Sequence, residues 1–223
     1  MFKVVFLLKR RPDMSLEAFH HHLRQVHAPL VVARPEVVRY VQSCTLPQGY
    51  VKGELLFDGI GEVWFESREG FEQYKKNPGT ASVIEDGAKF LDVGRTVIMP
   101  VDVHVIKDGA PLPGSVKSIE FVNRSESLGL DEFRRYWREH HGPLACHIDH
   151  FRRYEQNHLA PEGYNGKRSP AFDGLAVTWF DSTEDMKKAA RTPAYEATRL
   201  DEGNFLREGH LPFIITHEYL VKG

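Results

Sequence analysis

Hydrophobic and polar positions in the first half of the chain predict the order strand, helix, strand, strand, helix, strand. Residues 2–8 (FKVVFLL) form an apolar, β-branched run that is typical of a buried strand. Ser15 is placed to cap a helix with apolar side chains at helical spacing, and Pro29 and Pro35 predict that it does not run far beyond residue 28. The remaining pattern predicts strands over 37–46, 59–67 and 95–106, with helical segments over 69–77 and onward to about residue 90.

The same pattern occurs a second time. At a displacement of 114 residues, FHHHLRQVHAPL (19–30) falls on FRRYWREHHGPL (133–144), and RYVQSCTLPQGY (39–50) falls on RYEQNHLAPEGY (153–164). One further residue of displacement places FDGIGEVWFESRE (57–69) on FDGLAVTWFDSTE (172–184), followed by the pairs Pro78/Pro193, Asp86/Asp201 and Phe90/Phe205. The chain therefore consists of two copies of one unit.

The repeat predicts both the domains and the fold class. Residues 107–115 (KDGAPLPGS) have the composition of a linker, so we expect one domain over 1–108 and another over 115–223. The order βαββαβ is that of an α+β, ferredoxin-like unit with its helices on one face of an antiparallel sheet. The other sheet face then needs a cover, which the second copy or another chain could supply.

Composition narrows the partners. The 223 residues include 29 Lys and Arg against 31 Asp and Glu, which leaves no basic field for nucleic acid or anionic membrane. No apolar run approaches the roughly 20 residues of a membrane span. Cys44 and Cys146 make no disulfide framework and are typical of a reducing compartment. We therefore expect a cytoplasmic protein with neither nucleic acid nor membrane as a partner.

The candidate catalytic residues recur in both copies. His27 follows Phe19 and Leu23 at four-residue steps, and His141 follows Phe133 and Trp137 in the same way, so each His is expected on the core-facing side of its helix. Such a His is either a structural hydrogen-bonding group or a general acid/base at the wall of a pocket.

Two strand segments add polar groups beside these histidines. Alternate strand residues share a face, which places Tyr40 with Gln42, and Tyr154 with Gln156 and His158. A buried phenol and amide are expected either to line a pocket or to make structural hydrogen bonds. His158 has no histidine counterpart in the first copy, so the second copy is the better equipped. Trp64 and Trp179 are expected mainly in the core, with ligand stacking as the alternative, and Trp137 completes the candidate substrate-binding set.

A metal site is not expected. The runs His20–His22 and His140–His141 cannot direct all their rings at one ion from a helix, because successive residues point about 100° apart. His147 and His150 could share a face near Asp149, but they complete no ligand signature. The sequence also lacks GxGxxG, Walker A and GxSxG motifs, so dinucleotide, NTP and serine-hydrolase functions lose their usual support.

Taken together, the motifs resemble the EthD family of dimeric α+β barrels. The resemblance rests on KVVFLLKR at the start, HAPL or HGPL closing the first helix, RRYEQNH on the second strand and FDGLAVTWF on the third. It implies cofactor-free catalysis in a hydrophobic pocket between sheet and helices. Similar isomerases use a His at the end of the first helix and a Tyr on the second strand, which match His27 and Tyr40, and His141 and Tyr154. Their third-strand cysteine corresponds here to Val63 or Thr178.

We therefore expect a cofactor-independent lyase or isomerase acting on a small aromatic, polyketide-like or lactone compound. His141 would be the acid/base, with Tyr154 and His158 orienting the substrate, and His27 and Tyr40 would play matching parts unless the first copy is scaffold. The alternatives are a cofactorless monooxygenase of phenols or anthrones, a haem- or ligand-binding module without turnover, and a purely structural protein. A homodimer is expected if the two copies do not cover each other's sheet.

Overall fold

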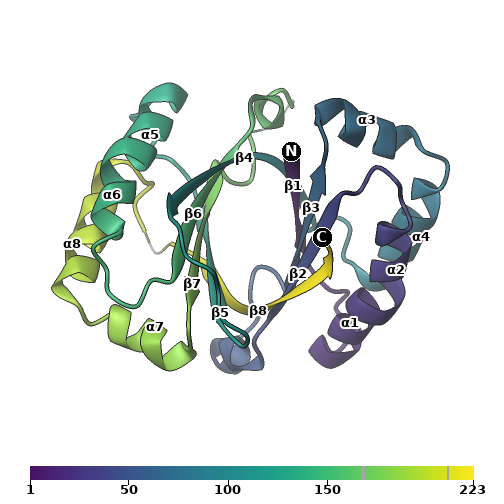
Figure 1. Cartoon of the computed structure of the whole chain (residues 1–223), viewed down its shortest axis with the longest axis horizontal. Helices are drawn as coiled ribbons and strands as arrows, with labels where there is room; N and C mark the ends of the chain where they lie inside the picture. Colours follow the sequence, from purple (N-terminus) through teal and green to yellow (C-terminus); the bar gives the residue numbers. More distant parts are fainter. Residues whose placement is uncertain (167–168, 210) are drawn as a thin grey trace. The chain divides into compact units, whose positions relative to one another are not determined.

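The computed structural model describes residues 1–166, 169–209 and 211–223. The chain divides into two compact units. Unit 1 comprises Met1–Val101 and Thr216–Gly223, and unit 2 comprises Asp102–Ile215. The predicted α+β class and the βαββαβ order of both repeats are confirmed (Figure 1).

Unit 1 contains the first repeat. Its sheet is antiparallel: β3 lies between β1 and β2, β4 pairs with the other edge of β1, and β8 pairs with the other edge of β2. Helices α1 to α4 cover one face of this sheet (Figure 1). The elements of the first repeat are β1 (Phe2–Leu8), α1 (Leu16–His22), η1 (Leu23–His27), α2 (Ala28–Val32), β2 (Arg39–Thr45), η2 (Pro47–Lys52), β3 (Gly59–Phe65), α3 (Arg68–Lys76), α4 (Thr80–Phe90) and β4 (Val97–Lys107).

Unit 2 repeats this arrangement, with β7 paired antiparallel to both β5 and β6. Helices α5 to α8 cover one face of its sheet (Figure 1). The elements of the second repeat are β5 (Val116–Val122), α5 (Leu130–Tyr136), η3 (Trp137–His141), α6 (Gly142–Ala145), β6 (Arg153–Leu159), η4 (Pro161–Tyr164), β7 (Gly174–Phe180), α7 (Thr183–Ala189), α8 (Pro193–Asp201), η5 (Glu202–Asn204) and β8 (Phe213–Lys222).

The last strand of each repeat is divided between the units. Residues 97–101 of β4 belong to unit 1 and pair with β1, whereas the rest of β4 belongs to unit 2. The start of β8 belongs to unit 2, while residues 216–222 pair with β2 in unit 1. Each compact unit therefore includes part of a strand from the other repeat.

The first helix of each repeat contains a π-helical turn, η1 or η3. The helix does not run far beyond residue 28, but it passes through Pro29 and continues to Val32. The Ala28 N–H bonds to the Leu23 carbonyl five residues back, and this wider turn places Pro29 in the first turn of α2, where a missing N–H is tolerated. The second repeat makes the same turn, with the Gly142 N–H bonded to the Trp137 carbonyl.

Asp58 and Asp173, which precede the third strand of each repeat, are buried hydrogen-bond acceptors. Asp58 accepts the Arg10 N–H at 2.8 Å, and Asp173 accepts the Arg124 N–H at 2.9 Å. Each also accepts a tyrosine hydroxyl, from Tyr50 or Tyr164. These contacts fasten the start of the third strand of each repeat to the end of its first strand.

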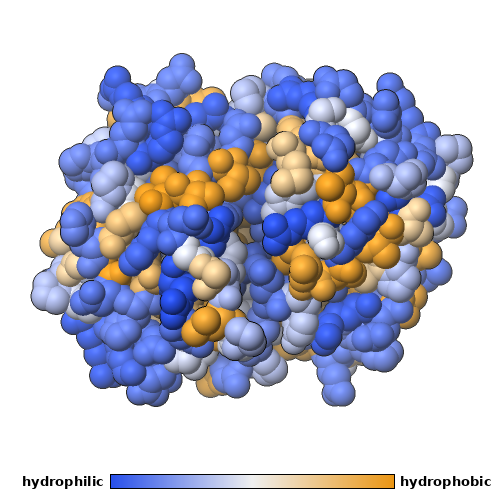
Figure 2. All heavy atoms as spheres, in the orientation of Figure 1, coloured by the Kyte–Doolittle hydropathy of each residue, from blue (hydrophilic) through white to orange (hydrophobic). Residues whose placement is uncertain are grey.

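The described surface is mainly hydrophilic, with separate hydrophobic patches on the face shown in Figure 2. No helix in the described ranges has the length and apolar composition needed to cross a membrane. Both cysteines, Cys44 and Cys146, are free thiols.

Candidate functional site

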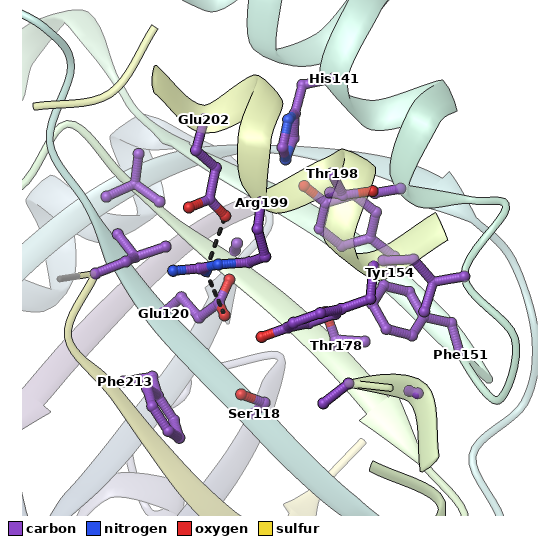
Figure 3. A pocket seen from close by; sticks show the side chains of 18 of the residues that line it. Ser118, Glu120, His141, Phe151, Tyr154, Thr178, Thr198, Arg199, Glu202 and Phe213 are labelled. Carbon is purple, nitrogen blue, oxygen red and sulfur yellow. Dashed lines mark hydrogen bonds and ion pairs between the residues drawn. The ribbon is translucent and has the colours of Figure 1, made fainter. Parts of the chain in front are cut away.

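Unit 2 contains a cavity of about 220 Å³ between the sheet and the helices that cover it. Its wall is mostly apolar and aromatic, and it includes Trp137, Phe151 and Phe205. The polar side chains that face it include Ser118, Glu120, His141, Tyr154, Thr178, Thr198, Arg199 and Glu202 (Figure 3). An apolar cavity with a few convergent polar groups is the usual form of a small-molecule site.

His141 reaches the cavity from the π-helical turn η3 and is buried. Its Nδ1 lies 2.8 Å from Oδ2 of Asp201, the last residue of α8. Burial lowers the pKa of His141, and the neighbouring Asp201 carboxylate opposes that shift. The neutral imidazole that results carries its proton on Nδ1, donated to Asp201, which leaves Nε2 as the basic nitrogen.

Asp201 is itself held in place by several donors. Its Oδ1 accepts the Tyr136 hydroxyl at 2.6 Å and the Asn204 amide at 3.1 Å. Burial acts to raise the pKa of this carboxyl, but the hydrogen bonds from Tyr136, His141 and Asn204 outweigh it, so the pKa is lowered. Asp201 is therefore a fixed anion that orients His141. Asp201 was not among the predicted site residues, although its identity with Asp86 in the repeat alignment was the available signal.

Tyr154 lies at the cavity wall with its hydroxyl oxygen between two donors. The Gln156 Nε2 and the Trp137 Nε1 each lie 3.2 Å from that oxygen. Burial raises the pKa of Tyr154, so the phenol stays protonated. Because both neighbours donate to the oxygen, the Tyr154 O–H is available as a donor to a group in the cavity.

Gln156 and His158 lie on the same strand face as Tyr154, as predicted, but behind the cavity wall. The Gln156 Nε2 donates to the Trp137 carbonyl at 2.7 Å, and its Oε1 lies 3.1 Å from His158 Nε2. The His158 ring stacks on Trp137 with centroids 4.4 Å apart. Burial, reinforced by His104, lowers the pKa of His158 to about 3. Gln156 and His158 thus support Trp137 and Tyr154, and neither lines the cavity.

The two third-strand tryptophans lie away from the cavity. Ala176, Thr178 and Phe180 on β7 line it, so Trp179 points to the opposite sheet face, where its ring centroid is 4.8 Å from Lys117 Nζ. Trp64 is placed similarly in unit 1, with its ring centroid 4.8 Å from Lys3 Nζ.

The first repeat has the same His–Asp pair. His27 Nδ1 lies 3.0 Å from Asp86, which also contacts His22 Nε2 at 3.1 Å. Gln42 Nε2 donates to the Leu23 carbonyl at 2.9 Å and to the Tyr40 hydroxyl at 2.8 Å. The pair therefore links the π-helical turn to the fourth helix of the unit in both repeats, and this link alone does not mark a catalytic site.

What differs is the space around the pair. The counterparts of Ser118, Ala189 and Thr198 are Val4, Tyr74 and Val83, and these side chains pack together in the hydrophobic core of unit 1. Tyr40 belongs to the same cluster. Larger apolar side chains thus occupy in the first repeat the positions that line the cavity in the second.

Three charged residues at the cavity were not predicted from the sequence. Glu120 extends from β5, while Arg199 and Glu202 extend from the end of α8 and the start of η5 (Figure 3). Their counterparts in the first repeat are Phe6, Ile84 and Gly87, so no repeated polar pattern marked them.

Within the described residues, no group of three or more His, Cys, Asp or Glu side chains is arranged to hold a metal ion. His147 is exposed, with Nδ1 3.3 Å from the Leu144 carbonyl, and His150 Nδ1 lies 3.7 Å from Asp185.

The sequence profile of the EthD domain matches residues 11–94 and again residues 125–209. The chain belongs to the EthD family. The family resemblance and the tandem repeat are thereby both confirmed. No curated protein matches this chain.

Several solved structures share the fold of the whole chain. An anthrone oxidase-like protein is 9% identical with a TM-score of 0.65, covering 99% of this chain and 93% of that one. A suggested monooxygenase from Lactobacillus acidophilus is 8% identical with a TM-score of 0.59, covering 98% and 94%. A variant of chlorite dismutase from Candidatus Nitrospira defluvii is 10% identical with a TM-score of 0.55, covering 97% and 90%. At these identities the likeness shows the fold alone.

Proposed function

We propose that this EthD-family protein is an enzyme that moves a proton on a small aromatic, polyketide-like or lactone compound bound in the unit 2 cavity. The observation that carries the proposal is His141 itself, a buried and neutral imidazole oriented by Asp201 at the wall of an apolar cavity. A positioned His with an orienting carboxylate is the usual arrangement for general base catalysis.

In this proposal, His141 Nε2 removes a proton from a weakly acidic C–H or O–H group of the substrate. Among the described residues, none forms a hydrogen bond with Nε2, so its lone pair is available. The Tyr154 hydroxyl would donate a hydrogen bond to the oxygen on which negative charge develops. The apolar wall strengthens both interactions because it excludes water.

The second repeat is the active one in this proposal. His27 and Tyr40 keep the same hydrogen bonds as their counterparts, but Tyr40 packs among Val4, Val63 and Tyr74 in the hydrophobic core. We therefore propose that His27 and Tyr40 stabilise unit 1 rather than contact substrate.

Reprotonation at another atom would make the enzyme an isomerase, and loss of a leaving group would make it a lyase. No cofactor is required for either reaction.

A cofactorless monooxygenase of phenols or anthrones is the second candidate. The fold shared with the anthrone oxidase-like protein favours it, and the same base could deprotonate a phenol before it reacts with oxygen. A cavity of about 220 Å³ suits a one- or two-ring compound better than a haem, since typical ligand pockets span ~300–1,000 Å³.

Deuterium exchange tests the proposal without knowledge of the natural substrate. Tetralone and related two-ring ketones carry an enolisable C–H, and proton NMR in deuterium oxide records its replacement. We expect the protein to accelerate exchange and His141→Ala to abolish the acceleration. A folded His141→Ala variant that exchanges as fast as the parent chain would contradict the assignment. An oxygen electrode distinguishes the candidates, because a monooxygenase consumes oxygen with its substrate.

We also propose a cytoplasmic homodimer. Exposed hydrophobic side chains on the last strands of the repeats, among them Ile98, Val105 and Leu220, would be covered by a second copy. Light scattering after size-exclusion chromatography should then give twice the 25.6 kDa mass of the chain.

A further inference from the structure

Glu120, Arg199 and Glu202 form a charged cluster at the wall of the unit 2 cavity (Figure 3). Arg199 Nη1 lies 2.8 Å from Glu202 Oε1 and 3.9 Å from Glu120 Oε1. One guanidinium is thus shared between two carboxyl groups from different elements. The remaining lining is largely apolar, so the cluster concentrates polarity at one part of the cavity.

The charges within the cluster nearly cancel. Burial raises the pKa of Glu120, and Arg199 opposes that shift. Burial also raises the pKa of Glu202, to about 8, with Glu120 adding to the effect and Arg199 opposing it. Near neutral pH, the raised pKa values of both carboxyl groups reduce the negative charge of the pair, which brings the cluster closer to balance with the positive charge of Arg199. Further titratable groups near the cluster are Asp201, Tyr195, Tyr154 and His141, and Lys187 lines the same cavity at an exposed position.

The cluster is not needed to build the fold. The corresponding residues of the first repeat are Phe6, Ile84 and Gly87, and that repeat forms the same βαββαβ arrangement without it. The three side chains are partly buried, with 31% of Arg199, 29% of Glu120 and 15% of Glu202 exposed, and withdrawing charged groups from water is unfavourable compared with apolar packing. The charged residues are thus found in the repeat that has the cavity, and apolar residues or glycine stand at those positions in the other.

We infer that the Glu120–Arg199–Glu202 cluster recognises an uncharged hydroxyl or keto oxygen of an aromatic ligand and disfavours carboxylate compounds. This inference rests on the proposed function, because it concerns the substrate of the same cavity. A hydroxyl can donate to a carboxylate and accept from a carboxyl O–H, and a keto oxygen can accept from that O–H. A ligand carboxylate would meet Glu120 and find Arg199 already paired.

Isothermal titration calorimetry of the full chain with three probes of similar shape tests the inference. The probes are naphthol, naphthoate and naphthylmethylammonium, measured at neutral pH. We expect naphthol to bind roughly tenfold or more tightly than naphthoate, because a hydrogen bond to a charged partner is worth about one order of magnitude in affinity or more.

Glu120→Gln/Glu202→Gln removes both carboxyl groups and leaves Arg199 unpaired. In this variant we expect the preference to reverse, with naphthoate binding more tightly than naphthol. Glu120→Gln alone should reduce the difference in affinity between naphthol and naphthoate. This single variant provides the test if the double variant does not fold. The matched control is Glu196→Gln on the exposed side of α8, which should leave the affinities of all three probes unchanged.

Equal affinities for naphthol and naphthoate in the parent chain would overturn the inference, as would preferential binding of the ammonium probe. An unchanged preference in the double variant would also overturn it. If none of the probes binds, the inference fails, while the deuterium-exchange assay still decides separately whether His141 transfers protons.

Discussion

Tyr74 and Ala189 occupy the same position in the two repeats, but their surroundings differ. Tyr74 packs in the core of unit 1, where its ring centroid lies 5.3 Å from that of Phe65. Ala189 lines the cavity of unit 2. The small Ala189 side chain therefore helps to leave the cavity of unit 2 open, whereas the Tyr74 ring fills the corresponding space in the core of unit 1.

Ala189→Tyr should restore in unit 2 the side chain that fills unit 1. We expect the phenol ring to occupy the cavity and to weaken naphthol binding at least about tenfold, with a change in stability within the roughly 1–3 kcal/mol typical of overpacking. Calorimetry and thermal unfolding measure the two effects. Ala197→Tyr, at an exposed position of α8, is the control and should not affect binding. Unchanged naphthol affinity in Ala189→Tyr would argue that ligands bind elsewhere.

Tyr74→Ala is the reverse change. Removing this buried ring leaves a cavity in unit 1, and we expect a loss of about 3–5 kcal/mol in the free energy of unfolding. Denaturant titration measures the loss. Deuterium exchange of tetralone should continue at the parental rate under conditions where the variant is folded, since the proposed reaction takes place in unit 2. A selective loss of exchange in a folded Tyr74→Ala variant would assign a catalytic part to the first repeat.

His141→Ala should slow catalysed exchange by roughly two to four orders of magnitude, the range expected for a general base. His27→Ala is the matched comparison, because His27 makes the same kind of hydrogen bond in the first repeat. We expect His27→Ala to lower the melting temperature and to preserve the exchange rate. Equal losses of activity in the two variants would show that the repeats are not functionally distinct.

The pH dependence of exchange should follow the ionisation of His141. Burial lowers its pKa below the ordinary value of 6.5, so the neutral base persists into mildly acidic solution and the rate falls only at lower pH. Asp201→Asn removes the anion that opposes this shift, and the midpoint should move to still lower pH. Titration of the His141 ring by NMR gives the midpoint directly. A midpoint above 6.5 in the parent chain would contradict the environment described for this residue.

The same shift affects stability. Since the pKa of His141 is lower in the folded state than in the unfolded state, the unfolded state binds more protons as the pH falls through the ordinary histidine range. The contribution of His141 to stability is therefore present above that range and decreases below it. His141→Gln should reduce the dependence of the melting temperature on pH in that window.

Gln156→Leu should destabilise the protein through the π-helical turn. The lost side chain donates to the Trp137 carbonyl and to the Tyr154 hydroxyl, and it faces His158. We expect a cost of about 1–3 kcal/mol, the range for leaving buried polar groups unsatisfied. Urea unfolding measures it, with exposed Gln48→Leu as the control. A cost equal to that of the control would mean that the amide does not hold the turn.

Much of the fold could be predicted from the sequence. Hydrophobic periodicity located the strands and helices, and the repeat displacement revealed two βαββαβ units because identical residues recur where both copies need the same local structure. Pro29 lies within the helix, before its end at Val32, at a position that was not predicted to allow a proline. A proline argues against an α-helical hydrogen bond, but it carries no information that a π-helical turn can accommodate it.

The repeat also determined part of the candidate site, since it singled out His141 and Tyr154 together with their counterparts. The repeat also contains Asp201, which matches Asp86, but its contact with His141 could not be predicted, because the two residues are 60 positions apart and the contact depends on how α8 packs against η3. His158, by contrast, was predicted as a site residue although it does not line the cavity. Its strand register was predicted correctly, but only packing decides that Trp137 stands beside it and that it lies behind the cavity wall.

The sequence by itself thus determined the family, the two repeats and the residue types available for chemistry, because these depend on local periodicity and on matching positions. Tertiary structure decided that the second repeat has the cavity, because an open volume results from the combined sizes of side chains on several elements, such as Ser118, Ala189 and Thr198. It also decided that Glu120, Arg199 and Glu202 meet, since the strand and the helix that carry them come together only in the folded chain.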